Sequence, residues 1–495
     1  MNETTVYLHT QFQIDRVDRR IFGGFLEHMG RAVYQGIYDP ESVHADDKGF
    51  RKDVLSALDE LGFTTMRYPG GNFASGYHWM DGVGLPRKRP AVRELAWQSL
   101  EPNQIGTDEY ITLCRKMGWT PMITVNLGTG TPEEARNWVE YCNCPTGSRY
   151  ADQRASNGNK EPFGVKLWCL GNEMDGHWQL GHVPADQYAI RAQQAAKMMK
   201  DTDADIELVA CGSCGTGMAT YMEWDQQVLS YLGELADYVS LHRYSGNRND
   251  DTADFLAEGK AIDRQIEEMD AACRFVQAKA RSSKRTYLCF DEWNVWYKNH
   301  ESDGKGKFAP HLIEEVYNLE DALVVGSYLN SFIRHADAVK IANLAQIVNV
   351  IAPIQTRGDE LLIQSIFYPF QMVSKRREGT ALQVAVSGPV YDSQSHGPTQ
   401  LVDASAILNQ DKLSVFAVNR SLDESAMLRV VLADRQITGL ESAERLSGTD
   451  PKSANSFEEP GVVKSQAFED CLIADGQASI ELLPLSFSAV SLKIT

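Results

Sequence analysis

The sequence predicts an α/β protein: a (β/α)8 TIM barrel followed by a C-terminal all-β sandwich of the jelly-roll type. Short apolar runs alternate with helical patterns at intervals of tens of residues, as in successive βα units, and polar or glycine-rich residues follow nearly every run. After about residue 374 the chain changes to short strand-like runs separated by Gly, Asp, Ser and Asn, which is typical of an all-β module. The length of 495 residues fits a barrel of roughly 250–400 residues with a smaller companion.

Eight apolar runs are the candidates for the barrel strands. Helical patterns between them suit the crossover helices; residues 49–61, for example, carry Val54, Leu55, Leu58 and Leu61 at helical spacing, and residues 186–199 are rich in Ala and Gln. Side chains at the C-terminal ends of barrel strands line the active-site face, so the residues after each run are candidates for function. The runs span residues 21–26, 64–68, 122–125, 167–170, 207–210, 238–241, 287–292 and 339–344.

The domain boundary is expected near the change in pattern. We predict that residues 15–375 form the barrel and that residues 376–495 form the sandwich, whose strand-like runs include residues 382–386, 413–418, 427–431 and 487–494. Residues 5–14 alternate like a single strand. Because chain termini are often close in space, we expect residues 1–14 to join the sandwich.

Composition and charge exclude several classes of function. The net charge of −19 and the pI near 5.1 disfavour a nucleic-acid partner and suit a neutral or cationic substrate. No apolar run approaches the roughly 20 residues that span a bilayer, and residues 1–16 lack the basic and apolar regions of a secretory signal. We therefore expect a cytoplasmic protein without a membrane partner.

Nothing in the sequence indicates a cofactor or a metal. The nine cysteines are interpreted as reduced thiols, and the pairs Cys142-x-Cys144 and Cys211-x-x-Cys214 lack the repeated CxxC form of a zinc site. The GxGxxG and GxxxxGK[ST] patterns that cradle phosphates are missing, as is the GxSxG nucleophile elbow.

Two glutamates stand at the ends of predicted strands. The run 167–170 stops at Gly171-Asn172-Glu173, and the run 287–290 leads into Asp291-Glu292. Hydrolysis of a glycosidic bond requires one protonated carboxyl and one ionised carboxylate, and the fourth and seventh strands lie on opposite sides of a barrel mouth. A separation of roughly 5 Å would imply a retaining mechanism. The alternative is that each glutamate is a helix-entry or surface residue.

Other polar and aromatic side chains follow the strands. The polar ones are expected to hold sugar hydroxyls, although each alone could be a capping group; they are Glu27, Arg67, Asn72, Asn172, His242, Tyr244 and Gln346. The aromatic ones could stack on a sugar or could pack a loop onto the barrel rim; they are Trp79, Trp178, Trp293 and Trp296.

Six long motifs resemble glycoside hydrolase family 51, the intracellular α-L-arabinofuranosidases. They are GGFLEHMGRAVYQGIYDP (residues 23–40), RYPGGNFASGYHWMDGVG (67–84), LWCLGNEMDGHWQ (167–179), LHRYSGN (241–247), DEWNVWY (291–297) and ANLAQIVNVIAPI (342–354). The resemblance implies an enzyme that releases terminal L-arabinose from arabinan, arabinoxylan or arabino-oligosaccharides with retained configuration. It also implies a C-terminal β-sandwich and a homo-oligomer, often a hexamer.

The same resemblance implies a role for each site residue. By this resemblance, Glu173 would be the general acid/base and Glu292 would be the nucleophile. Arg67 and His242 would support Glu292. The implied ligands of the arabinofuranose hydroxyls are Glu27, Asn72, Asn172 (at the 2-hydroxyl), Tyr244 and Gln346, with Gln355 as the alternative to Gln346. Residues 142–161 are expected to shape the aglycone side.

Three other functions remain open. The same site could serve a β-xylosidase or an endoglucanase-like enzyme. A carbohydrate-binding barrel without catalysis is a second alternative, and a metal- or Schiff-base-dependent lyase is a third.

Overall fold

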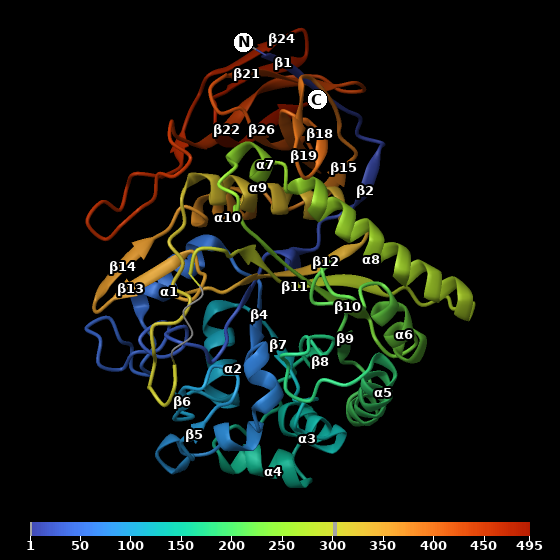
Figure 1. Cartoon of the computed structure of the whole chain (residues 1–495), viewed down its shortest axis with the longest axis vertical. Helices are drawn as coiled ribbons and strands as arrows, with labels where there is room; N and C mark the ends of the chain where they lie inside the picture. Colours follow the sequence, from blue (N-terminus) through green and yellow to red (C-terminus); the bar gives the residue numbers. More distant parts are fainter. Residues whose placement is uncertain (1, 300–303) are drawn as a thin grey trace.

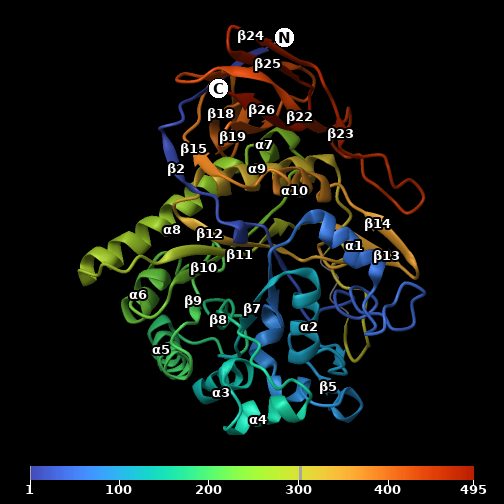
Figure 2. The same cartoon turned by 180° about the vertical axis from the view of Figure 1, so that it is seen from behind.

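The computed structural model describes residues 2–299 and 304–495. A barrel with surrounding helices forms the larger part, and a β-sandwich lies on one side of it, with both chain ends in the sandwich (Figure 1). The view from behind shows the same arrangement, with α8, α9 and α10 between the two parts (Figure 2). Within the described residues, no helix combines the length and the apolar character needed to cross a membrane.

The eight predicted runs form a closed barrel of parallel strands, which confirms the predicted fold. The order around the barrel follows the chain, with the last strand paired to the first. The strands are β3 (Gly23–Phe25), β4 (Thr65–Tyr68), β7 (Thr120–Thr124), β8 (Leu167–Leu170), β9 (Glu207–Ala210), β10 (Tyr238–Ser245), β11 (Tyr287–Val295) and β12 (Val339–Ala345). Side chains such as Met122, Val209 and Cys289 fill the barrel interior, so it is a packed core.

Helices and short hairpins surround the barrel. The runs at 49–61 and 186–199 are helical as expected, in α1 and α5. The α-helices are α1 (Lys52–Leu61), α2 (Thr107–Met117), α3 (Pro132–Asn143), α4 (Arg149–Ser156), α5 (Ala185–Thr202), α6 (Glu223–Leu232), α7 (Thr252–Leu256), α8 (Gly259–Ala280), α9 (Leu319–Arg334) and α10 (Phe367–Ser374). Short helices are η1 (Arg19–Ile21), η2 (Asn72–Gly76), η3 (Trp79–Gly82) and η4 (Pro86–Lys88), and the hairpins pair β5 (Val92–Arg93) with β6 (Leu100–Glu101) and β13 (Ile354–Arg357) with β14 (Glu360–Ile363).

The C-terminal part is a sandwich of a seven-stranded and a five-stranded sheet around its own apolar core. The larger sheet has the order β2 (Gln13–Arg16), β15 (Thr380–Leu382), β19 (Val402–Asn409), β20 (Lys412–Asn419), β26 (Ser486–Ile494), β22 (Ile437–Ser447) and β23 (Gln466–Ala467). The smaller has the order β16 (Ala385–Ser387), β1 (Asn2–Leu8), β21 (Ala426–Leu432), β25 (Gln477–Leu482) and β24 (Cys471–Ala474). β17 (Val390–Ser393) and β18 (Gly397–Gln400) form a separate hairpin.

Residues 5–14 do not form the single strand that their alternation predicted. The chain turns after β1, where the Phe12 amide donates to the His9 carbonyl and the Thr10 amide donates to Asp434 Oδ1 at 3.0 Å. β2 then begins in the other sheet. The physical reason is that the turn moves the chain from one sheet to the other, which an alternating pattern cannot reveal.

Helix α9 joins the two parts of the molecule. All of its residues except Arg334 are buried, because the barrel covers one side and the seven-stranded sheet covers the other. β20 matches this arrangement: Leu413, Val415 and Ala417 face the sandwich core, while Phe416 and Val418 belong to the core shared with the barrel.

A loop of the sandwich completes the N-terminus of α9. The amides of Leu319 and Glu320 donate to the carbonyls of Ser453 and Pro451, at 2.9 and 3.0 Å. Lys452, between them, places its Nζ 2.7 Å from Glu320 Oε1 and 2.5 Å from Asp250 Oδ1. The Glu320 side chain is fully buried, so Lys452 provides the positive charge beside a buried carboxylate.

Replacing Lys452 by methionine is therefore expected to destabilise the protein by about 1–3 kcal/mol, because the buried carboxylate of Glu320 loses its cation. Urea denaturation measures this free energy. Lys412→Met is the control, because Lys412 and Glu441 form a more exposed pair at 3.0 Å that should contribute less than about 1 kcal/mol. Equal losses in the two variants would contradict the role of Lys452.

Candidate active site

A cavity of about 780 Å³ lies at the C-terminal ends of the barrel strands. Nine of the residues singled out in the sequence line it: Glu27, Asn72, Glu173, Trp178, His242, Tyr244, Glu292, Trp296 and Gln346. Arg67 and Asn172 lie just behind this lining and hydrogen-bond to each other. Residues 142–161, expected to shape the aglycone side, contribute no side chain to the lining of this cavity.

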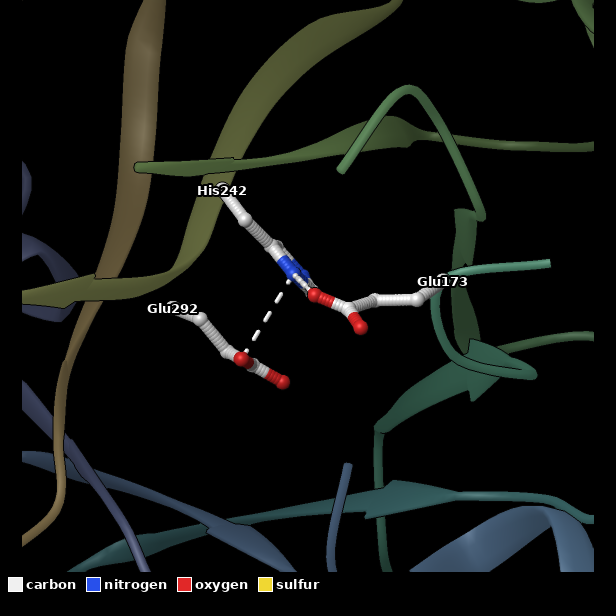
Figure 3. Close-up of side chains that lie close together, drawn as sticks. All are labelled: Glu173, His242 and Glu292. Atoms are coloured by element: carbon white, nitrogen blue, oxygen red, sulfur yellow. Dashed lines mark hydrogen bonds and ion pairs between the residues drawn. The ribbon is translucent and has the colours of Figure 1, made fainter. Parts of the chain in front are cut away.

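The two glutamates face each other across the cavity. One carboxylate oxygen of Glu173 lies within 4.8 Å of one carboxylate oxygen of Glu292. Glu292 belongs to β11, whereas Glu173 follows β8 in a tight turn (Figure 3). Gly171 has φ +89° and Glu173 itself has φ +44°, a left-handed conformation that is uncommon for a residue with a side chain and that clusters at functional sites.

His242 lies between the two carboxylates. Its Nδ1 is 3.0 Å from Glu173 Oε1 and 3.5 Å from Glu292 Oε2, and its Nε2 is 3.2 Å from Asp291 Oδ1. Burial lowers the pKa of His242, but the charges of Glu292 and Asp291 and the hydrogen bonds to Asp291 and Glu173 outweigh it, so the pKa lies well above the ordinary value. His242 therefore contacts both glutamates, not Glu292 alone.

Arg67 orients the carboxylate of Glu292. The buried guanidinium donates to Glu292 Oε1 at 2.6 Å and to Asn172 Oδ1 at 2.7 Å, and its Nε lies 3.2 Å from Asp291 Oδ2. The Tyr244 hydroxyl donates to the other oxygen of Glu292, Oε2, at 2.8 Å. Both oxygens of Glu292 thus accept hydrogen bonds, which fix the orientation of its carboxylate.

Asp291 is a functional residue for which the sequence analysis assigned no role. Strict alternation along a strand would turn either Asp291 or Glu292 away from the barrel interior. The pairing of β11 with β12 shifts between Phe290 and Trp293, and as a result both carboxylates are buried against Arg67 and His242. The signal for Asp291 in the sequence was its place beside Glu292, directly after the apolar run 287–290.

Glu27 and Gln346 form a second polar cluster in the cavity. Gln346 Nε2 donates to Glu27 Oε2, and the Glu27 amide donates to Gln346 Oε1, both at 3.1 Å. Glu27 Oε1 accepts from the Phe73 amide and from Trp97 Nε1, both at 3.0 Å. Gln355 lies outside the cavity and donates to the Glu315 carbonyl, so Gln346 is the glutamine at this site.

Burial, together with the charge of Glu292, raises the pKa of Glu27 from 4.5 to about 7. Below pH 4.5 Glu27 is protonated in both the folded and the unfolded chain, and above pH 7 it is ionised in both. As the pH rises between these values, the unfolded chain ionises more readily than the folded chain, so the folded state is progressively destabilised. Glu27→Gln is expected to be about 1–3 kcal/mol more stable than the parent at pH 8, and no more stable at pH 4.5. Urea denaturation at the two pH values measures the difference; an equal effect at both would contradict it.

The close approach of Gly71 to Glu292 leaves no room for a side chain. A Cβ at this position would lie 2.7 Å from Glu292 Oε1 and 3.3 Å from Asn172 Nδ2. Gly71→Ala is expected to lower kcat/KM by about 100-fold, because it displaces the Glu292 carboxylate, with little loss of stability. Gly461→Ala, which meets nothing within 4 Å, is the control. Unchanged steady-state kinetics in Gly71→Ala would contradict the expected displacement.

The four tryptophans divide into two pairs. Trp178 lines the cavity with 48% of its surface exposed and donates from Nε1 to Glu173 Oε2 at 2.9 Å, and Trp296 lines it beside Tyr244. Trp79 and Trp293 are buried elsewhere: Trp79 stacks on Trp138, and Trp293 packs against Tyr328 and Phe332. The prediction of an aromatic subsite is wrong for these two, because their rings fill the core.

Other parts of the lining were not predicted, among them Trp97 and residues 214–218. Trp97 comes from the loop of the β5–β6 hairpin, far along the chain from any barrel strand. Residues 214–218, after β9, add two glycines, Thr216, Met218 and the partly exposed Cys214. Neither segment carries a pattern that distinguishes it from an ordinary loop.

Comparisons with known proteins show the family to which the chain belongs. Models of the α-L-arabinofuranosidase 1 domain and of the α-L-arabinofuranosidase C-terminal domain match residues 57–264 and 291–486. The intracellular exo-α-(1→5)-L-arabinofuranosidase 1 of Bacillus subtilis (strain 168) is 44% identical over 100% of this chain and 99% of its own. That of Acetivibrio thermocellus is 46% identical over 86% of this chain and 87% of its own.

Solved structures show the same relationship. A family 51 α-L-arabinofuranosidase from Bifidobacterium longum has a TM-score of 0.95 and 36% identity, and it covers 99% of this chain and 100% of its own. The arabinose complex of α-L-arabinofuranosidase from Thermotoga maritima has a TM-score of 0.89 and 32% identity, with the same coverage. The chain belongs to the α-L-arabinofuranosidases of glycoside hydrolase family 51.

Proposed function

We propose that the chain is a retaining, exo-acting α-L-arabinofuranosidase that releases terminal L-arabinose from arabinan, arabinoxylan or arabino-oligosaccharides. The observation that carries the retaining mechanism is the approach of one carboxylate oxygen of Glu173 to within 4.8 Å of one carboxylate oxygen of Glu292. Retaining glycosidases hold their two carboxyl groups about 5–5.5 Å apart, whereas inverting enzymes leave about 6.5–9.5 Å for a water molecule.

The two glutamates divide the chemistry. Glu173 protonates the oxygen of the leaving group while Glu292 attacks the anomeric carbon, which gives a covalent arabinosyl-enzyme and a free aglycone. Glu173, now ionised, removes a proton from water, and this water attacks the anomeric carbon and releases Glu292. Orientation of Glu292 by Arg67 and Tyr244 supports its role as the nucleophile.

The polar cavity side chains are proposed to bind the arabinofuranose hydroxyls. These are Glu27, Asn72, Tyr244 and Gln346. Asn172, which lies just behind the lining and donates to Asn72 Oδ1, is proposed to bind the 2-hydroxyl, where hydrogen bonds strengthen in the transition state. Asn172 lies against Arg67 beside the nucleophile, which supports this placement. Trp178 and Trp296 are proposed to contact the aglycone.

The names of the relatives inform the rest of the proposal. Those from B. subtilis and A. thermocellus are named intracellular and exo-α-(1→5), so we propose a cytoplasmic enzyme that cleaves terminal 1→5 linkages. From the resemblance to the family we also propose that the protein is a homo-oligomer, specifically a hexamer. Light scattering tests this proposal.

Hydrolysis of an aryl α-L-arabinofuranoside, followed by proton NMR, tests the function and the mechanism together. The α-anomer of arabinose is expected to appear first, before mutarotation. Initial β-anomer would overturn double displacement. Turnover of an aryl xyloside or glucoside but not of the arabinofuranoside would overturn the substrate assignment.

A further inference from the structure

A buried carboxylate, that of Glu94, lies in the hairpin that carries Trp97 into the cavity. Glu94 is only 8% exposed, although the next residue, Leu95, is 62% exposed. The hydrogen-bond donors to this carboxylate are two backbone amides and one hydroxyl, not the side chain of a lysine or an arginine. Because a buried carboxylate without a cation is costly, these donors must compensate for the lost contact with water.

The carboxylate of Glu94 holds the loop of the hairpin in one conformation. Its Oε2 accepts from the Trp97 amide at 2.9 Å, and its Oε1 accepts from the Ser99 amide at 2.6 Å and from the Ser99 hydroxyl at 3.0 Å. The Glu94 amide donates to the Ser99 carbonyl at 3.1 Å, which closes the loop of residues 95–98. The backbone of Trp97 is therefore fixed relative to the two strands of the hairpin.

The base of the same hairpin is fixed to the barrel beside Glu27. Glu101 Oε2 lies 2.9 Å from Nδ1 of His28, the residue directly after Glu27, and Glu101 Oε1 accepts from the Asn103 amide at 2.6 Å. Both Glu101 and His28 are buried. Since the base is anchored, the position of the Trp97 side chain depends on the conformation of the loop that Glu94 holds.

Trp97 contacts the polar cluster that is proposed to bind the sugar. Its Nε1 donates to Glu27 Oε1 at 3.0 Å, and its side chain lines the cavity. The Phe73 amide and Gln346 Nε2 are the other donors to the Glu27 carboxylate, at 3.0 and 3.1 Å. A shift of the indole by about 1 Å would break its hydrogen bond and leave Glu27 less well oriented.

We propose that Glu94 is a positioning residue of the enzyme: its carboxylate fixes the loop of residues 95–98 so that the Trp97 indole donates to Glu27 and forms the cavity wall beside it. Glu94 does not line the cavity and acts only through Trp97. This inference rests on the proposed function, because the arabinofuranoside is taken to bind at Glu27.

Steady-state kinetics of the full chain with an aryl α-L-arabinofuranoside tests the role of Glu94. Glu94→Ala is expected to lower kcat/KM about tenfold, mainly through a higher KM, because Glu27 is proposed to bind the sugar and takes no part in bond cleavage. Glu94→Gln keeps one oxygen for the Ser99 donors and should recover part of the loss. Unchanged kinetics in Glu94→Ala, or a lower kcat at an unchanged KM, would overturn the proposal.

A double-mutant cycle tests whether Glu94 acts through Trp97. Trp97→Ala removes the indole, so that adding Glu94→Ala to this variant should change kcat/KM by no more than about twofold. A further tenfold loss in the Trp97→Ala background would show that Glu94 acts by another route, and would overturn the proposal.

Asp46→Ala is the matched control. The Asp46 side chain is 7% exposed and also holds a turn, accepting from the amides of Lys48 and Phe50 at 2.9 Å, but it lies outside the cavity. Its loss should leave kcat/KM within about twofold of the parent, because the two sites are independent. A loss equal to that of Glu94→Ala would overturn the proposal, since loosening any turn would then be enough.

The same experiment separates this inference from the proposed function. A parent protein that hydrolyses an aryl xyloside but not the arabinofuranoside would contradict the proposed function. The cycle of Glu94→Ala and Trp97→Ala, repeated with the xyloside, would then still decide whether Glu94 positions Trp97.

Discussion

Replacing Glu292 by alanine is expected to abolish turnover, lowering kcat by a factor on the order of 10⁴ or more, because the variant lacks the carboxylate proposed to form the covalent intermediate. Steady-state hydrolysis of an aryl α-L-arabinofuranoside measures the loss. Glu207→Ala is the matched control, since Glu207 begins β9 at the opposite end of the barrel and should keep kcat within about twofold. A folded Glu292→Ala protein with near-normal turnover would refute the nucleophile assignment.

The companion variant, Glu173→Ala, separates the two roles. It is expected to lose about 10²–10⁴-fold on substrates with poor leaving groups, which need a proton from the enzyme, and much less on substrates with good leaving groups. Azide should restore part of the rate, because it attacks the arabinosyl-enzyme without help from a base. If neither a good leaving group nor azide restored the rate of the folded variant, Glu173 would be excluded as the acid/base.

Replacing Arg67 by alanine is expected to destabilise the protein by about 3–5 kcal/mol, because Asp291 and Glu292 are left buried without their guanidinium. kcat/KM should also fall by more than about 100-fold, since Glu292 loses the donor that orients it. Arg67→Lys should rescue little, because one ammonium group cannot reach Asp291, Glu292 and Asn172 together. Urea denaturation and steady-state kinetics give the two quantities.

The control for this prediction is Arg274→Ala. Arg274 is 58% exposed in its side chain and pairs with Asp270 on the surface of α8, so its loss should cost less than about 1 kcal/mol. If Arg67→Ala were as stable as this control, the buried ion pairs would not hold the site together.

The barrel could be predicted from the sequence because its strands are buried on both faces. Each appears as a short apolar run that ends in polar residues, and all eight runs became barrel strands. The same reasoning failed at residues 5–14, where the turn at His9–Phe12 depends on Asp434, a partner more than 400 residues away. Local alternation contains no information about such a partner.

The site was predictable where position along a strand determines it. Glu173 follows β8 and Glu292 lies in the second half of β11, and a barrel brings these parts of its strands together. Asp291 was assigned no role because the pairing shift in β11 breaks the alternation. Trp79 and Trp293 were misplaced because a tryptophan that fills a core and one that contacts a sugar look alike in a sequence.

The pairing of β1 with β21 has a consequence for how the chain is made. Asn2 lies opposite Ala426 in this parallel pair, and the other neighbour of β1, β16, begins at Ala385. A ribosome adding about 5–20 residues per second needs roughly 20–85 s to connect β1 to β21. Until β16 has been made, β1 has no partner in its sheet, while the barrel strands emerge in the order in which they pair. The barrel can therefore assemble during synthesis, whereas the sandwich, together with the loop that completes α9, forms only after the strands from β15 to β26 have been made.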